Sequence, residues 1–338
     1  MRRITTYLVA CIIANLSSFE SSASGIKIKI DSLPTNAGHS FIVAGYLANY
    51  SIANFHWEAL PYLDRIYYFS VSPSENGDFV YTKNDSTILS SLSSKLTRQQ
   101  LYLVIGGWTQ SKNIPVMAGS QSKRREYINN VVAYCKRMKI AGVDLDWEDY
   151  PVMVDDNQFV ILVQELSTEL HKNNMAFTVA LGVSAKKIHL ATQIEKYVDE
   201  INIMSYGKFD EAGNQSPMNL FETWLNDYVK AGIKKDKLIA GVPFYGKRLP
   251  NPEDHTRPSF AYSEIVADTH PDFAVNSYGK YAYNGVSLIA AKAAYLSKSG
   301  YRGIMSWELS QDLPPDSDSS LLRTIHTATL PHPTGLVR

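Results

Sequence analysis

AGVDLDWEDY, residues 141–150, places acidic side chains at every second position: Asp144, Asp146 and Glu148. Apolar residues alternate with them and the flanking residues favour a β-strand, in which successive side chains point to opposite faces. The pattern therefore predicts three carboxyl groups on one strand face. Like charges repel, and burial raises the cost of ionising each acid. The alternatives are a solvated acidic strand face, a metal site, or a catalytic site whose acids have separated pKa values.

Outward from this stretch, short apolar runs alternate with longer amphipathic ones. LYLVIGG, residues 101–107, is typical of a strand buried on both faces of a parallel sheet. Residues 124–139, 156–172 and 217–231 have helical periodicity. The alternation predicts an α/β fold, a (β/α)8 TIM barrel, with an active site at the C-terminal ends of its strands. The expected strands are 41–47, 65–71, 100–107, 142–148, 176–182, 200–206, 238–246 and 303–309.

The predicted barrel occupies residues 40–328 and is followed by a C-terminal tail, 329–338. Within it, Pro, Asp, Tyr and Asn are frequent over residues 250–285. This composition predicts a small insertion or long loop between strands 7 and 8. Glu148 is expected as the last residue of strand 4.

The N-terminus resembles a secretory signal. Arg2 and Arg3 precede an apolar run of about residues 4–16, which is too short to span a membrane, and small residues follow. We expect a signal peptide over 1–24, cleaved near Ala23, a lead-in over 25–39, and a secreted or periplasmic protein. Two alternatives remain: a lipoprotein signal that anchors the chain through a lipidated Cys11, and an ordinary disordered terminus.

Composition excludes several function classes. The formal net charge is zero, so nothing indicates binding to nucleic acid. After cleavage near Ala23 only Cys135 would remain, which leaves no intramolecular disulfide. The His and Cys residues lack zinc-ligand spacing, so we expect neither a metal nor a cofactor.

The acid motif resembles that of glycoside hydrolase family 18, the chitinase-like barrels. Its strand-4 pattern is Asp-Gly-x-Asp-x-Asp-x-Glu, and AGVDLDWE here differs only at the first position. Further segments resemble the family in order, and together they cover roughly residues 40–326. They are IGGW (105–108), MSYG (204–207), GVPFYGK (241–247) and GIMSWELSQD (303–312).

The resemblance implies substrate-assisted retaining hydrolysis. The family is an exception to the usual pair of carboxylates, because the acetamido oxygen of an N-acetylated aminosugar acts as nucleophile. Glu148 would be the general acid and base. Asp146 would bind the acetamido N–H, Asp144 would share a proton with Asp146, and Tyr206 would donate to the acetamido oxygen.

The resemblance also implies a set of substrate-binding residues. Trp307 would form the floor beneath the sugar. Tyr46 and Phe69 would line the same subsite or belong to the core. Trp108 and Tyr245 would bind outer sugars or pack internally. Met204, in the MSYG segment, completes the set.

The leading interpretation is a secreted, endo-acting chitinase that hydrolyses β-1,4-linked N-acetylglucosamine polymers. We expect chitin or its oligosaccharides as the partner, and a monomer. One alternative is a hydrolase of peptidoglycan or of the N-glycan core. Another is a chitinase-like lectin or inhibitor without catalysis, because fold does not imply function. A metal-dependent barrel fits poorly, because neighbouring strands supply no matching ligands.

Three positions differ from the family pattern. Val104 replaces a Ser, Ala141 the first Asp, and Gly207 the Asp beside Tyr206. With fewer neighbouring charges, Glu148 should ionise more easily unless desolvation dominates. We therefore expect a lower pH optimum than in proteins that keep that Asp.

Overall fold

A closed parallel barrel forms the body of the protein. The computed structural model describes residues 41–149, 152–248, 259–272 and 275–330. Its barrel strands follow the order β1-β12-β7-β6-β5-β4-β3-β2, and β1 pairs with both β12 and β2, which closes the ring. This confirms the predicted (β/α)8 TIM barrel. The strands are β1 (Ile42–Ala48), β2 (Arg65–Val71), β3 (Gln100–Gly106), β4 (Gly142–Asp146), β5 (Ala176–Leu181), β6 (Glu200–Ile203), β7 (Leu238–Pro243) and β12 (Gly303–Trp307).

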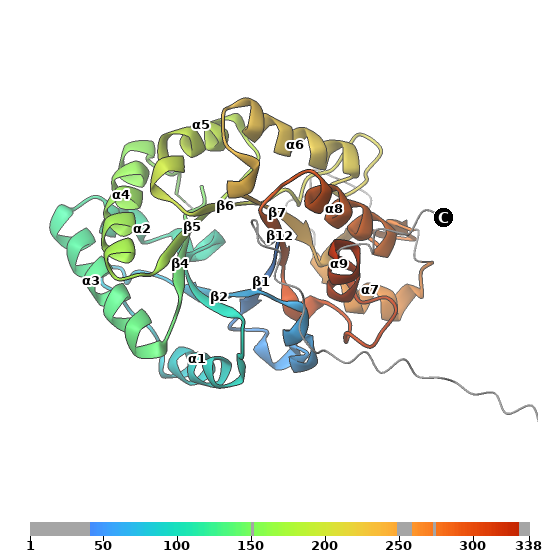
Figure 1. Cartoon of the computed structure of the whole chain (residues 1–338), viewed down its shortest axis with the longest axis horizontal. Coiled ribbons are helices and arrows are strands. Elements are labelled where there is room, and N and C mark those ends of the chain that lie inside the picture. The colour runs from blue at the N-terminus through green and yellow to red at the C-terminus, as the bar shows by residue number, and fades with distance from the viewer. Residues whose placement is uncertain (1–40, 150–151, 249–258, 273–274, 331–338) are drawn as a thin grey trace, which may run out of the picture. The chain divides into compact units, whose positions relative to one another are not determined.

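Helices surround the barrel, as Figure 1 shows. Several begin at a side chain that accepts a hydrogen bond from the first turn, such as Asp155 before α4 and Ser184 before α5. The helices are α1 (Lys83–Lys95), α2 (Ile114–Ala118), α3 (Gln121–Met138), α4 (Asp156–Lys172), α5 (Ala185–Ile194), α6 (Met218–Lys230), α7 (Tyr262–Thr269), α8 (Val286–Lys298) and α9 (Leu321–Thr329). Short 3-10 helices cover Ile52–Asn54, Trp57–Tyr62, Trp108–Ser111, Glu195–Tyr197, Lys235–Lys237 and Leu309–Gln311.

Side chains alternate between two cores along each strand. On β4, Val143 and Leu145 join the large apolar layer between strands and helices, and Trp147 continues it. The other face points into the barrel, where aromatic and small apolar residues from β1, β2, β3, β7 and β12 form a second cluster. The alternation predicted for residues 141–150 therefore places Asp144 and Asp146 inside the barrel.

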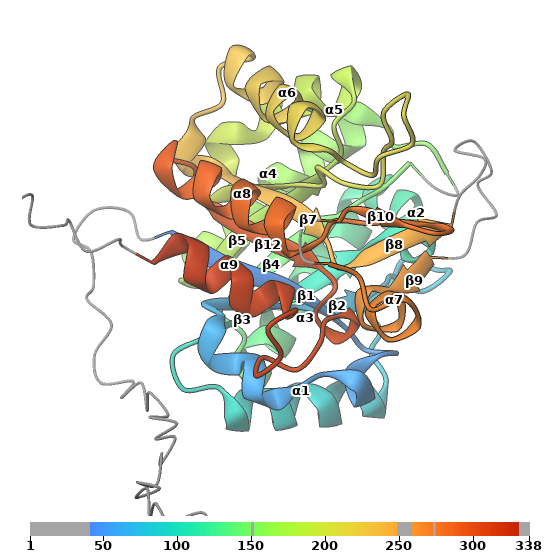
Figure 2. The ribbon, with the colours of Figure 1, turned by 90° about the vertical axis from the view of Figure 1, so that its right-hand side faces the viewer.

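A small antiparallel sheet follows β7, in the order β10-β11-β8-β9. Figure 2 shows β8, β9, β10 and α7 grouped on one side of the barrel. The predicted insertion between the last two barrel strands is thus present, although its first strand begins before residue 250. Its strands are β8 (Tyr245–Arg248), β9 (Ser259–Ala261), β10 (Ser277–Tyr278) and β11 (Tyr281–Ala282).

The predicted end of β4 is wrong. β4 stops at Asp146, so Glu148 lies two residues beyond the strand and is not its last residue. The reason is local: the Asp146 carbonyl accepts from Gly107 and from the hydroxyl of Ser111, and that hydroxyl accepts from the N–H of Glu148. The predicted ends of β6, β7 and β12 also lie two or three residues too far along the chain. The predicted signal peptide, Cys11 and the C-terminal tail from residue 331 lie outside the described residues. Within the described part, no helix has the length and apolar character that a membrane crossing needs.

Candidate active site

Three acids rise from the barrel interior toward the C-terminal ends of the strands. Asp144 is fully buried and Asp146 is 4% exposed, whereas Glu148 is only partly buried. β4 positions the first two directly, and the segment after β4 positions the third. The arrangement leaves Glu148 as the acid that solvent, or a bound sugar, reaches first.

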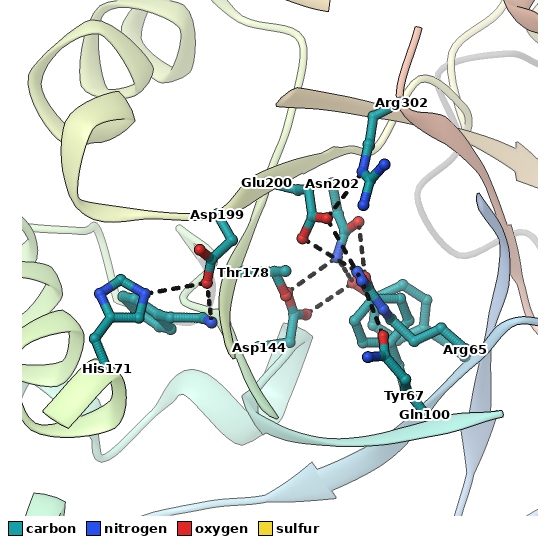
Figure 3. Close-up of polar contacts among 12 residues, drawn as sticks. Arg65, Tyr67, Gln100, Asp144, His171, Thr178, Asp199, Glu200, Asn202 and Arg302 are labelled. Carbon is teal, nitrogen blue, oxygen red and sulfur yellow. Dashed lines mark hydrogen bonds and ion pairs between the residues drawn. The ribbon is translucent and has the colours of Figure 1, made fainter. Parts of the chain in front are cut away.

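Asp144 is held by three hydrogen-bond donors. The hydroxyl of Tyr46 donates to Oδ2 over 2.8 Å, and Thr178 donates to Oδ1 over 2.6 Å. The amide nitrogen of Asn202 donates to the same Oδ1 over 3.0 Å, as Figure 3 shows. Burial raises the pKa of Asp144, while these bonds and the nearby Arg65 lower it. The net result is a raised pKa, but the three donors oppose the effect of burial because each of them stabilises the carboxylate form.

Asp146 has a different environment. Its buried Oδ1 has no hydrogen-bond partner among the described residues. Burial raises its pKa well above the usual range, and the charges of Glu148 and Asp144 raise it further. Neither of these acids makes a hydrogen bond to Asp146 within the described part of the chain. Asp146 therefore receives nothing from the described residues that would offset the effect of burial and of the two neighbouring acids, apart from the more distant charge of Lys187.

The carboxylate of Glu148 accepts a hydrogen bond from the backbone. The backbone N–H of Trp108, at the start of a 3-10 helix after β3, donates to Oε1 over 2.6 Å. Gly107 permits this turn, because its φ is +90° and an added Cβ would lie 2.1 Å from the ring of Phe69. Burial raises the pKa of Glu148, whereas the Trp108 N–H and the ammonium of Lys187 lower it. Desolvation thus outweighs the loss of neighbouring charges, and Glu148 does not ionise more easily than an ordinary glutamate.

Aromatic rings stand beside the acids. Trp307 packs against Phe69 with ring centroids 4.6 Å apart and against Tyr46 at 5.6 Å. Tyr46 and Phe69 are both buried, and the Tyr46 hydroxyl is engaged by Asp144. These two residues therefore support Asp144 and Trp307 from below, whereas Trp307 itself stays partly exposed.

A second wall comes from the ends of β6 and β7. Tyr206 and Tyr245 meet edge to face with centroids 6.4 Å apart. Among the described residues the Tyr206 hydroxyl makes no hydrogen bond. Burial raises its pKa, and Tyr245 and the charges of Asp146 and Glu148 raise it further. Met204 packs beside it against the interior cluster. The side chain of Trp108 is 58% exposed, so the contact that the structure shows for it at Glu148 is through its backbone.

Several residues of the site were missed in the sequence. Thr178 and Asn202 bind Asp144, Ser111 holds the chain around Glu148, and Lys187 pairs with Asp149 at 3.0 Å. One signal was present: EINI, residues 200–203, alternates polar and apolar residues on a barrel strand. Such alternation marks the inward polar positions.

The three residues that differ from the family pattern, Val104, Ala141 and Gly207, lie in different surroundings. Val104 is fully buried and lies opposite Asp144 in the ladder between β3 and β4. Ala141 packs against the interior cluster below β4. Gly207 has a φ of +77°, and an added Cβ would lie 3.1 Å from the hydroxyl of Tyr245. Only the last departure borders the cleft wall.

A hollow of about 270 Å³ adjoins Phe69. Tyr50, Tyr81 and Gln110 are among its lining residues, so it lies near the C-terminal ends of β1, β2 and β3. In the described part of the chain, no group of three or more His, Cys, Asp or Glu side chains is placed to hold a metal ion.

Comparison with known proteins identifies similar chains. The family model described as "Glycosyl hydrolases family 18" matches residues 42–312. Endochitinase 1 of Metarhizium robertsii is 28% identical over 269 residues, which are 64% of this chain and 62% of the relative. The chain therefore spans less than two thirds of that relative's length.

Solved structures show the same fold. The chitinase ChiB of Flavobacterium johnsoniae superimposes with a TM-score of 0.75 at 24% identity, over 86% of this chain and 94% of that one. A chitinase-like agglutinin of Robinia pseudoacacia gives a TM-score of 0.70 at 20% identity, over 85% and 99%. The fold is thus shared by a protein named as an enzyme and one named as an agglutinin.

Proposed function

The chain belongs to glycosyl hydrolases family 18, and on that premise we propose that it is a chitinase that cleaves within β-1,4-linked N-acetylglucosamine polymers. One observation carries the proposal. Glu148, with a pKa raised by burial and an oxygen held by the Trp108 N–H, lies just beyond the end of β4, partly exposed, next to two buried acids. A partly exposed acid whose pKa is raised is suited to protonate a glycosidic oxygen.

The mechanism we propose is substrate-assisted and retaining. Glu148 protonates the leaving oxygen, the acetamido oxygen attacks the anomeric carbon, and Glu148 then takes a proton from water. The cyclic intermediate carries positive charge. Asp146, whose Oδ1 is free of protein partners among the described residues, accepts from the acetamido N–H and steadies the intermediate through this hydrogen bond. Tyr206 donates its hydroxyl to the acetamido oxygen and holds it for attack.

The other acid at a strand end does not replace the acetamido group. Glu308 follows Trp307 but is 1% exposed, and its carboxylate accepts from Ser51 and Ser310. It therefore faces away from the cleft, as expected if Trp307 faces the sugar. This supports a substrate that carries its own nucleophile, which means an N-acetylated aminosugar.

We place the activity outside the cytoplasm. The basic and apolar N-terminal residues are those of a signal peptide over 1–24, with lipidation at Cys11 as the alternative. Cleavage near Ala23 would release the barrel as a secreted or periplasmic monomer. N-terminal sequencing of the mature protein tests this: a start near residue 24 supports secretion, and a lipidated Cys11 supports anchoring.

Hydrolysis of a fluorogenic chitobioside and chitotrioside tests the activity. We expect turnover by the wild type and a loss of about 10²–10⁴-fold in Glu148→Gln, the range for a general acid. Glu126→Gln, on the exposed face of α3, makes the same chemical change away from the cleft and should leave the rate unchanged. No turnover by the wild type, with retained binding of chitooligosaccharides, would instead identify a lectin. No turnover and no binding would direct attention to peptidoglycan and N-glycan substrates.

A further inference from the structure

An ion cluster closes the barrel beneath the acids. Arg65 begins β2 and Glu200 begins β6, and both are buried. Arg65 Nη1 lies 3.3 Å from Glu200 Oε2, and Arg302 Nε lies 3.1 Å from Glu200 Oε1. The guanidinium of Arg65 also stacks over the ring of Tyr102 at 4.2 Å. The carboxylate of Glu200 thus lies between two guanidinium groups.

From this cluster a line of hydrogen bonds runs up to Asp144, and Figure 3 shows its members side by side. Arg65 Nη1 donates to the hydroxyl of Tyr67 over 3.0 Å. Tyr67 donates to Oδ1 of Asn202 over 3.2 Å, and Asn202 donates to Oδ1 of Asp144 over 3.0 Å. The Asn202 nitrogen also donates to the Tyr46 oxygen over 3.2 Å, and Tyr46 donates to Asp144.

The direction of this line is fixed at its lower end. An arginine side chain only donates hydrogen bonds, so the Tyr67 oxygen must accept there and its proton must point to Asn202. The amide of Asn202 must then turn its oxygen to Tyr67 and its nitrogen to Asp144. Every bond in the line therefore presents a donor to Asp144, and bonds aligned in this way strengthen one another.

Asp144 lies at the upper end of this line, and the charge of Arg65 is among the groups that lower its pKa against the effect of burial. The cation at the lower end therefore favours the carboxylate form of Asp144. Asp146 receives no such donors from the described residues and lies between two other acids, so its pKa is the more strongly raised. Other charged or titratable groups around the three acids are Tyr46, Tyr67, Lys187, Tyr206, Tyr245 and Asp149.

We propose that Arg65 is a positioning residue for catalysis: acting through Tyr67 and Asn202, it keeps Asp144 an ionised acceptor and so places the proton of the acid pair on Asp146, beside the sugar. The proposal rests on the proposed hydrolase function. Loss of the Arg65 charge moves the proton down to Asp144 and leaves Asp146 ionised next to Glu148. Both the lost cation and the new anion raise the pKa of Glu148.

The pH profile of kcat/KM on the chitotrioside tests the proposal. Activity needs protonated Glu148 and falls as pH rises through its pKa. In Arg65→Gln we expect this alkaline limb to move up by about one pH unit, and in Arg65→Lys, which keeps the charge, to move much less. Arg98→Gln is the matched control, because this exposed arginine pairs with Asp64 outside the line of donors. It should leave the limb in place.

Tyr67→Phe gives a second, milder test. It keeps all charges but breaks the line between Arg65 and Asn202, so the limb should rise by a smaller amount even if Arg65→Gln fails to fold. If the alkaline limbs of the wild type and Tyr67→Phe lie at the same pH and only the rate is lowered, the proposal is overturned and Arg65 is a structural residue.

Carbon-13 NMR of labelled aspartate carboxyl groups separates this proposal from the proposed function, because it needs no turnover. We expect Asp144 to titrate at a lower pH than Asp146 in the wild type. In Tyr67→Phe the two titrations should move closer together or exchange their order. Titration of Asp144 above Asp146 in the wild type would overturn the placement of the proton. If the expected titrations occur in a protein without hydrolytic activity, the hydrolase function fails and the electrostatic assignment stands.

Discussion

The backbone N–H of Trp108 and the carboxylate of Glu148 are joined by a hydrogen bond of 2.6 Å between the end of β3 and the segment after β4. This donor stabilises ionised Glu148 and lowers its pKa, in opposition to burial. Burial is the larger of the two effects, so the pKa of Glu148 is raised and the Trp108 N–H limits the rise. The geometry of the short segment from Gly107 to Ser111 therefore controls the acid.

Ser111→Ala should weaken catalysis although it changes none of the three acids. Its hydroxyl, 2% exposed, bridges the Asp146 carbonyl and the Glu148 N–H, and its loss leaves both groups without that partner. We expect kcat/KM to fall by about tenfold and the free energy of unfolding by about 1–3 kcal/mol. Ser122→Ala, on the exposed side of α3, should change neither. Wild-type kinetics in Ser111→Ala would show that the segment holds Glu148 without this bridge.

Gly207→Asp restores the family's carboxylate next to Tyr206. A second anion near the cleft raises the pKa of Glu148, so the alkaline limb of kcat/KM should move to higher pH by up to about one unit. The φ of +77° at Gly207 also makes any side chain costly there. Gly207→Ala carries that strain without the charge, and should lower activity with no shift of the limb. Equal shifts in both variants would refute the electrostatic explanation.

Lys292 makes stability depend on pH. It is fully buried on α8 and donates to the carbonyl of Ser216 and to Oδ1 of Asn284 over 2.7 and 2.6 Å. Burial lowers its pKa from 10.5 to about 7. Between these values the unfolded chain binds more protons than the folded one, so the contribution of this lysine to stability rises with pH and its penalty vanishes above 10.5.

Urea unfolding at pH 7 and pH 9 measures this effect. In the wild type, Lys292 should raise the free energy of unfolding by about 2 kcal/mol between pH 7 and pH 9, and Lys292→Met should lack this increase. Lys298→Met, on the exposed end of the same helix, should keep the wild-type gain. A gain that persists in Lys292→Met would assign it to other groups.

Cys135 should report global unfolding. Its thiol is fully buried on α3, and burial raises its pKa to about 12. Only the thiolate reacts readily, so in a Cys11→Ala background an aromatic disulfide reagent should leave the native protein unlabelled. Labelling should appear with the unfolding transition in urea, at one thiol per chain. Rapid labelling in the absence of urea would mean that α3 opens locally.

Sequence alone predicted the barrel, because its strands are buried on both faces and their apolar runs stand out between amphipathic helices. It also predicted the alternation along 141–148, since that depends only on the strand itself. The end of β4 was misplaced because the N–H of Glu148 donates to the hydroxyl of Ser111, and no pattern along residues 141–148 indicates that contact.

The partners of Asp144 illustrate the harder part. Thr178 and Asn202 are single polar residues in apolar strands, and each reaches Asp144 only because the barrel closes in one register, with Thr178 opposite Asp144. Arg65 and Glu200 are separated by 135 positions and meet for the same reason. Contacts of this kind depend on closure of the whole ring, and a pattern read along one segment does not contain them.

The three donors to Asp144 all belong to barrel strands: Tyr46 to β1, Thr178 to β5 and Asn202 to β6. Trp108, Tyr206 and Tyr245, by contrast, lie on segments beyond the ends of the barrel strands, and Tyr245 begins the sheet inserted after β7. Exchanging those segments for ones from a protein with another glycan preference would therefore alter which sugar docks and leave the surroundings of Asp144 unchanged. The barrel strands can therefore be kept as a constant scaffold while the segments beyond them are exchanged.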